Sequence, residues 1–193
     1  MSVVIVTPTH VACDHMVISP IMPSKAYVDT NHRKFFVSPD NTFVYGTCGI
    51  FEPDDVVQSA YFDNIIKIFQ LIIEHPKEIL STDQQDIIFK KLAGLEDFFI
   101  TTDFIDTPRL LVSKKYRFRF RVKGKTKEEM TFRFAPVGDH CAIGALDGEA
   151  IGLLKAGLDL KTTFDLLSNM NSVVSDKFTS FEINNLNDPE EVL

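Results

Sequence analysis

The chain contains no tryptophan and only three cysteines among its 193 residues. Cys13, Cys48 and Cys141 have no spacing typical of a disulfide framework, which favours a reducing compartment, so we expect a cytoplasmic protein. No apolar run approaches the roughly 20 residues that a membrane-spanning helix needs. The first residues also lack a basic stretch followed by an apolar one, so we expect no signal peptide.

The chain also has no excess of positive charge. Lysine and arginine number 20 against 27 aspartates and glutamates, a formal net charge of −7. This balance argues against a protein that coats nucleic acid. The hydrophobic share of 45% excludes wholesale disorder, and the 17 phenylalanines indicate a thick interior between layers. We expect a single domain over residues 1–187 and a loose acidic tail over residues 188–193.

Hydrophobic periodicity predicts the elements in order. Apolar, β-branched stretches predict a strand pair over residues 2–18, and a turn at residues 38–41 joins two further strands. Helical spacing follows over residues 53–74 and 81–94. The remaining elements are strands at 98–101, 109–112, 116–122, 130–134 and 141–144, helices at 148–156 and 159–173, and a last strand at 178–183.

This order also predicts the fold class. Strands, two helices, strands, two helices and a strand make two sheets, each of which must bury one face on the other sheet and one face on helices. The expected architecture is therefore α+β, a four-layer αββα sandwich. Gly157 is expected to end the first of the C-terminal helices and Asp159 to cap the start of the second.

Three local motifs carry a resemblance to a known family. Residues 11–14 read VACD, residues 43–49 read FVYGTCG, and residues 141–145 read CAIGA before a glycine-bounded helix. In this order the motifs resemble those of proteasome β-subunits and the HslV peptidase, and the similarity extends from Ser2 to about Ile183. The resemblance implies the N-terminal-nucleophile hydrolase fold. It also implies assembly into homo-oligomers, with a ring possible, no cofactor and no metal, and a peptide or protein substrate if the chain is active.

The resemblance also implies a set of site residues. Ser2 stands where the family has its nucleophile, whose own α-amine acts as base once Met1 is removed. Asp14 matches the aspartate that orients a catalytic lysine. Gly49, at the end of the loop over residues 46–49, would stabilise the oxyanion through its backbone N–H. Arg33 falls where the family has that lysine.

Arg33 is a departure, since arginine does not release its proton as lysine can. A shift of one residue would bring Lys34 to this position, and Lys25 is a second possible substitute. The family's later supporting serine and aspartate correspond to Ala145 and Ser172. The resulting hypothesis is a divergent proteasome-like subunit, consistent with a viral copy, whose degenerate active site leaves it a structural or assembly component of a homo-oligomer.

Two alternatives stay open. One is an active N-terminal-nucleophile endopeptidase that uses Ser2 after Met1 removal. The other is a non-proteolytic binding module that uses the strand over residues 115–123, where alternation gathers Lys115, Arg117, Arg119, Arg121 and Lys123 on one face. That face is expected to be solvated or to contact an acidic neighbouring subunit, with nucleic acid less favoured.

Three possible zinc ligands lie near the start of the sequence. His10, Cys13 and His15 lie within a short stretch and are ligand types that zinc prefers. On a strand, however, His10 faces the side opposite Cys13 and His15. We therefore expect no metal site.

Overall fold

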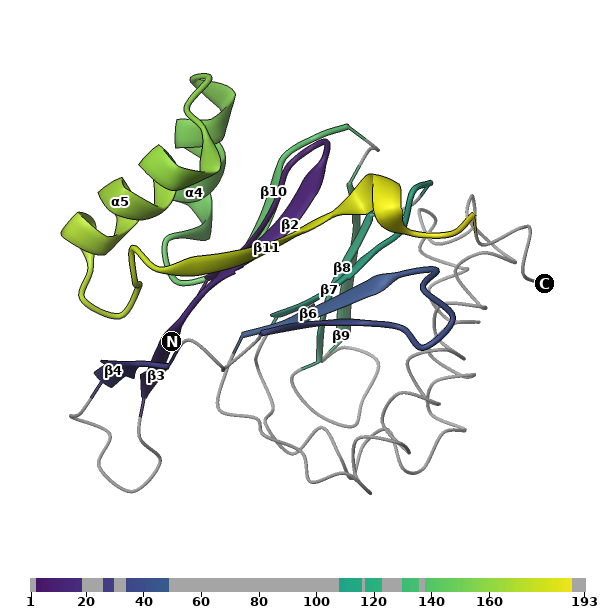
Figure 1. The fold of residues 1–193 in the computed structure, drawn as a ribbon, viewed down its shortest axis with the longest axis horizontal. Coiled ribbons are helices and arrows are strands. Elements are labelled where there is room, and N and C mark those ends of the chain that lie inside the picture. The colour runs from purple at the N-terminus through teal and green to yellow at the C-terminus, as the bar shows by residue number, and fades with distance from the viewer. Residues whose placement is uncertain are drawn as a thin grey trace.

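The computed structural model describes residues 3–18, 26–29, 34–48, 108–115, 117–122, 130–135 and 138–188. These residues form two main β-sheets, a small third sheet and two helices, labelled as in Figure 1. The first sheet lies between the helices and the second sheet (Figure 1). Helices, sheet and sheet are three layers of the expected four-layer sandwich, and the second expected helical layer, residues 53–94, lies outside the described residues.

The first sheet has four antiparallel strands in the order β10-β1-β2-β11. The bounds are β1 Val3–Val6, β2 His10–Asp14, β10 Cys141–Gly144 and β11 Phe178–Glu182. The pairing of β1 with both β2 and β10 places the start of the chain at the centre of this sheet.

The second sheet has five antiparallel strands in the order β5-β6-β7-β8-β9. Their bounds are β5 Phe35–Val37, β6 Val44–Thr47, β7 Pro108–Val112, β8 Arg117–Val122 and β9 Met130–Ala135. Strands β3 (Met16–Ile18) and β4 (Ala26–Val28) pair with each other in a separate two-stranded sheet.

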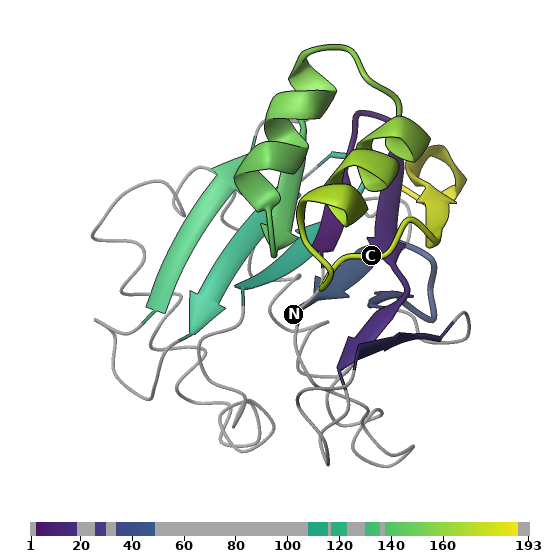
Figure 2. The ribbon, with the colours of Figure 1, turned by 90° about the vertical axis from the view of Figure 1, so that its left-hand side faces the viewer.

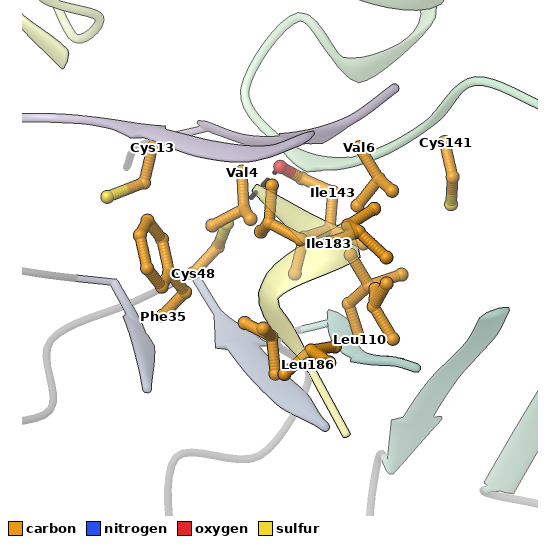
Figure 3. Close-up of a cluster of buried hydrophobic side chains, with 13 residues drawn as sticks. Val4, Val6, Cys13, Phe35, Cys48, Leu110, Cys141, Ile143, Ile183 and Leu186 are labelled. Atoms are coloured by element: carbon orange, nitrogen blue, oxygen red, sulfur yellow. Dashed lines mark hydrogen bonds between the residues drawn. The ribbon is translucent and has the colours of Figure 1, made fainter. Parts of the chain in front are cut away.

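Alternation along the strands divides the core into two clusters. Val4 and Val6 of β1 point into the space between the sheets, where they meet Leu110 of β7 and Ile143 of β10 (Figure 3). The intervening β1 residues belong to the other cluster, which packs against the helices. All the β1 side chains are fully buried. The sheet that carries the N-terminal strand is thus covered on both faces.

Helices α4 (Asp147–Lys155) and α5 (Leu160–Met170) cover the outer face of the first sheet (Figure 2). Gly157 has a φ of 89°, a left-handed conformation that glycine adopts without strain, and it ends α4 as expected. The carboxylate of Asp159 accepts a hydrogen bond of 2.7 Å from the backbone N–H of Thr162. This cap begins α5 as the sequence predicts.

Most predicted elements in the described residues are confirmed, two have different bounds, and strand β4 was not predicted. The strand predicted up to residue 18 is divided, because β2 ends at Asp14 and β3 belongs to another sheet. Helix α5 ends at Met170 instead of residue 173, because Asn171 takes an extended conformation. The helices predicted at 53–74 and 81–94 and the strand at 98–101 lie outside the described residues.

The basic face predicted for residues 115–123 needs a correction. Arg117 is not solvated: only 1% of it is exposed, and its guanidinium donates to the carbonyl oxygens of Pro8 and Asp139. Arg119 is about one third exposed and pairs with Asp147 at the start of α4. The two arginines therefore join β8 to the first sheet's loops and helix, which speaks against an open basic binding stripe.

Gly46 of β6 lies at a close approach of the two sheets. A Cβ atom built there would lie 3.1 Å from Val4 Cγ1, tighter than an ordinary contact. Gly46→Ala is expected to lower the free energy of unfolding by about 1–3 kcal/mol, the usual cost of overpacking a core.

Gly152 of α4 supplies the control, because a Cβ atom there would meet nothing within 4 Å. Gly152→Ala should raise stability by about 0.5–1 kcal/mol through helix propensity. Urea unfolding of both variants tests the pair. Equal effects would contradict the account of sheet packing.

Candidate active site

Asp14, the last residue of β2, forms the centre of a buried polar site. Its side chain is fully buried, yet both carboxylate oxygens are satisfied. Oδ1 accepts from the backbone N–H of Val3 at 2.9 Å and from Lys34 Nζ at 2.8 Å. Oδ2 accepts from the backbone N–H groups of Met16 at 3.1 Å and Ser175 at 3.3 Å. The carboxylate thus ties together the start of the chain, its own strand end and the segment before β11.

Lys34 is the only positive charge in hydrogen-bond contact with this carboxylate among the described residues. Its side chain is 3% exposed, so the ion pair with Asp14 is almost completely buried. The backbone of Lys34 is held as well, since its N–H donates to Cys13 Sγ at 3.4 Å and its carbonyl accepts from Thr47 N at 2.9 Å. These contacts to both sheets fix where the lysine enters the site.

A buried ion pair of this kind needs an explanation. Removing two charges from water costs several kcal/mol each, and their attraction compensates only where further hydrogen bonds complete the geometry. The three backbone donors on Asp14 supply those hydrogen bonds. Because apolar residues of similar size would fill the space at no such cost, the pair is more easily explained by chemistry than by stability.

Cys48 lies at the end of β6 beside this pair. Burial raises the pKa of its thiol to about 12, with Lys34 acting to lower that pKa and Asp14 to raise it. Its sulfur donates to the carbonyl oxygen of Ile143 at 3.2 Å, which the dashed line in Figure 3 marks. Cys48 is therefore a protonated core thiol that feels both charges of the site.

Of the four site residues that the sequence predicts, the structure describes only Asp14. Asp14 occupies the central position, while Ser2, Arg33 and Gly49 lie outside the described residues. The lysine beside Asp14 is Lys34, the residue that a one-residue shift of the match at Arg33 brings to this position. The need for a side chain that can share a proton was the signal that could have selected it.

The two positions matched to the family's supporting serine and aspartate hold other residues, Ala145 and Ser172. Ala145 has no hydroxyl and packs against the helix-side core cluster. Ser172 is exposed, and the residue that contacts Asp14 from this segment is Ser175, through its backbone N–H. The supporting serine and aspartate are thus absent at these two positions.

The part of the chain that the structure describes holds no group of three or more metal-ligating side chains. Within the same residues, no helix is long and apolar enough to cross a membrane.

The solved structures similar to this chain include HslV and Anbu proteins. HslV from Trypanosoma brucei superposes with a TM-score of 0.56 over 94% of this chain and 97% of its own, at 12% sequence identity. Anbu from Hyphomicrobium sp. strain MC1 gives a TM-score of 0.48 at 14% identity, covering 97% of this chain and 84% of Anbu. Anbu from Yersinia bercovieri gives 0.47 at 12% identity, covering 94% and 81%. No family model and no curated protein matches the chain.

These findings define the class of fold. The chain has the N-terminal-nucleophile hydrolase fold, with two packed antiparallel sheets and helices on the outer face of the first. At 12% identity the similarity to HslV shows the fold alone. What the site does must be argued from its own residues.

Proposed function

We propose that this chain is a proteasome-like peptidase subunit in which Ser2, freed by removal of Met1, is the nucleophile. The observation that carries the proposal is the buried ion pair between Lys34 and Asp14, whose carboxylate also accepts from Val3 N. That N–H belongs to the peptide bond between Ser2 and Val3. The pair therefore lies against the first peptide bond of a chain that begins at Ser2.

The chemistry follows from these positions. Ser2 Oγ would attack the carbonyl carbon of a peptide bond and give its proton to the Ser2 α-amine. The C–N bond then breaks, and the α-amine passes the proton to the leaving amine. Water, deprotonated by the same amine, hydrolyses the ester and restores Ser2. The ammonium of Lys34 would keep the pKa of the α-amine low enough for it to act as base near neutral pH.

Two further features support this role. An ammonium has three N–H donors, and within the described residues Asp14 is the only partner of Lys34 Nζ, which leaves donors for groups at the site. Gly49, which would supply the oxyanion N–H, follows Cys48, and the charges of Lys34 and Asp14 both act on the Cys48 thiol.

Substrate and assembly rest on the resemblance to proteasome subunits and HslV. We propose peptide or unfolded protein segments as substrates and a homo-oligomer as the working form. Native mass spectrometry reports the assembly directly.

A second candidate is a non-catalytic subunit that keeps the fold and the assembly surface. Ala145 favours it, since the family's supporting serine is missing at that position. In this reading the ion pair is an inherited structural feature, and the chain would assemble without cleaving peptides.

The experiment that separates the two candidates combines intact mass with hydrolysis of fluorogenic peptides. If the proposal holds, purified protein lacks Met1 and cleaves peptides, and Ser2→Ala lowers kcat/KM by about a thousandfold or more, as loss of a covalent nucleophile does. Retention of Met1, or equal hydrolysis by Ser2→Ala, would exclude the peptidase and leave the non-catalytic subunit.

A further inference from the structure

Helix α5 carries two large apolar side chains on its exposed side. Met170 is 58% exposed and Leu166 is 38% exposed. They lie four residues apart, so they occupy neighbouring turns on one side of the helix, and we call them the α5 pair. Phe164 and Leu167, in contrast, are fully buried in the core cluster beside the first sheet. The apolar residues of α5 therefore extend beyond the face that the sheet covers.

The α5 pair is held on a fixed support. The ring of Phe164 stacks on that of Phe178 in β11, with centroids 4.6 Å apart. The cap at Asp159 begins the helix, and at its other end Asn171 N–H donates to the Leu167 carbonyl oxygen at 3.0 Å. Figure 1 shows α5 on the side of the first sheet that points away from the second sheet. A partner that binds this surface has little of α5 to order, which lowers the cost of binding.

The charges beside the α5 pair nearly cancel. Lys161 Nζ lies 2.8 Å from Asp165 Oδ2, and these side chains are 74% and 41% exposed. Lys177 Nζ lies 3.7 Å from Asp176 Oδ2, and these side chains are 66% and 52% exposed. Asp165 raises the pKa of Lys161 most and Asp176 raises it further, so the two ion pairs are neighbours. The remaining acid, Asp159, lies against the positive end of the helix dipole.

This balance of charge decides between possible partners. Nucleic acid and anionic lipid are attracted by net positive charge, and a strongly charged protein is attracted by the opposite sign. The surface around the α5 pair offers neither. Two copies of a chain with a net charge of −7 repel each other over most of their surface. They meet with least repulsion where the charges are balanced, and burial of the α5 pair supplies the attraction there.

We propose that this surface of α5 is an interface with a second copy of the chain, in which Leu166 of each copy packs against Met170 of the other. A two-fold axis perpendicular to the helices produces this contact, and the helices then run antiparallel. A parallel arrangement would set Lys161 against its own copy. The inference rests on the homo-oligomer of the proposed function and names one of its interfaces. A two-fold contact closes on itself, so a ring would need a further contact.

The experiment uses the full chain with single cysteines at the proposed contact. Leu166→Cys and Met170→Cys are purified separately, mixed, and oxidised with copper phenanthroline. Val28→Cys is the control, because Val28 on β4 is 47% exposed but lies outside α5. The wild-type protein, whose three cysteines are buried, gives the background. Peptide mass spectrometry identifies the linked residues, and sedimentation velocity compares wild type with Met170→Glu and Val28→Glu.

We expect the mixture of Leu166→Cys and Met170→Cys to cross-link about tenfold faster or more than either variant mixed with Val28→Cys, because the contact raises the effective concentration of the two thiols. Met170→Glu should raise the Kd of self-association by about a hundredfold or more, since a two-fold contact contains the substitution twice. Val28→Glu should leave the Kd unchanged.

The inference is overturned if Met170→Glu associates like wild type, or if the mixture cross-links no faster than the Val28→Cys controls. A wild-type protein that stays monomeric at its highest soluble concentration also overturns it, and flotation of that monomer with phosphatidylcholine vesicles would assign the surface to lipid. Cross-linking as expected in a protein that cleaves no peptide would refute the peptidase and leave the interface intact.

Discussion

Asp14→Ala is expected to lower the free energy of unfolding by about 3–5 kcal/mol, because it leaves a buried charge without its partner. The carboxylate accepts from Lys34 Nζ and from the backbone N–H groups of Val3, Met16 and Ser175. The substitution therefore also removes the acceptor of three buried backbone donors. Lys34→Met should cost less, since Asp14 keeps those three donors.

Urea denaturation at neutral pH measures the effect, with the exposed pair of Lys161 and Asp165 as control. In that pair the two side chains are 74% and 41% exposed. Asp165→Ala should change stability by less than about 0.5 kcal/mol, as exposed helix pairs do. If Asp14→Ala is as mild as Asp165→Ala, the buried site does not hold the sheets together as described.

Lys34→Met is expected to slow acylation of Ser2 by about 10²- to 10⁴-fold, the contribution of a general base, because the Ser2 α-amine depends on the Lys34 charge to act as one. Without the nearby ammonium, the pKa of the Ser2 α-amine should rise towards its ordinary value of about 8. The amine acts as base only when it is deprotonated, so the residual rate should need a higher pH than the wild-type rate. A pH–rate profile of single-turnover acylation measures both changes.

Two further variants, Lys34→Arg and Lys161→Met, are compared with Lys34→Met. Arginine keeps the positive charge, but its planar guanidinium is bulkier than an ammonium and would displace that charge from its place beside the α-amine. It should therefore restore part of the stability and little of the rate. Lys161→Met, on the exposed face of α5, should change neither. An unchanged rate in folded Lys34→Met would contradict the role assigned to the lysine.

The fold could be predicted because its signals are local. Alternation in β1 and β2, the cap at Asp159 and the left-handed Gly157 each follow from nearby residues. The environment of Arg117 could not be predicted in this way. Its burial depends on the Pro8 turn and the Asp139 loop, which are distant in sequence and lie over β8 only once the sheets pack.

The residues of the site also differ in whether nearby sequence or distant contacts determine their place. Asp14 could be predicted because residues 11–14 carry a recognisable motif, although the strand was expected to continue to residue 18. The choice between Arg33 and Lys34, in contrast, depended on a one-residue alignment within a segment of weak pattern. The decisive contact, from Lys34 Nζ to Asp14 Oδ1, joins the two sheets. Strand periodicity within either sheet carries no information on it. The sequence analysis treats His15 only as a metal ligand, because its ring contacts the Asp29 carbonyl and the Thr179 hydroxyl, both distant in sequence.

The buried pair of Lys34 and Asp14 also reduces the number of positions at which the site departs from the family pattern. The sequence alone suggested loss of the lysine, which favoured a degenerate site. With Lys34 on Asp14, the departures that remain are Ala145 and Ser172, neither of which supplies the nucleophile, the base or the charge beside it. A site that kept only structural value would have little reason to retain a buried lysine, since its desolvation is costly.

The central claim is that this buried pair serves a nucleophile at the start of the chain. Intact and tandem mass spectrometry of the wild-type protein, treated with a peptide β-lactone, tests it most directly. We expect a chain that begins at Ser2, one ester adduct on Ser2, no adduct in Ser2→Ala, and a much slower adduct in folded Lys34→Met. A chain that keeps Met1, or an adduct that forms equally well without Ser2 or Lys34, would contradict it.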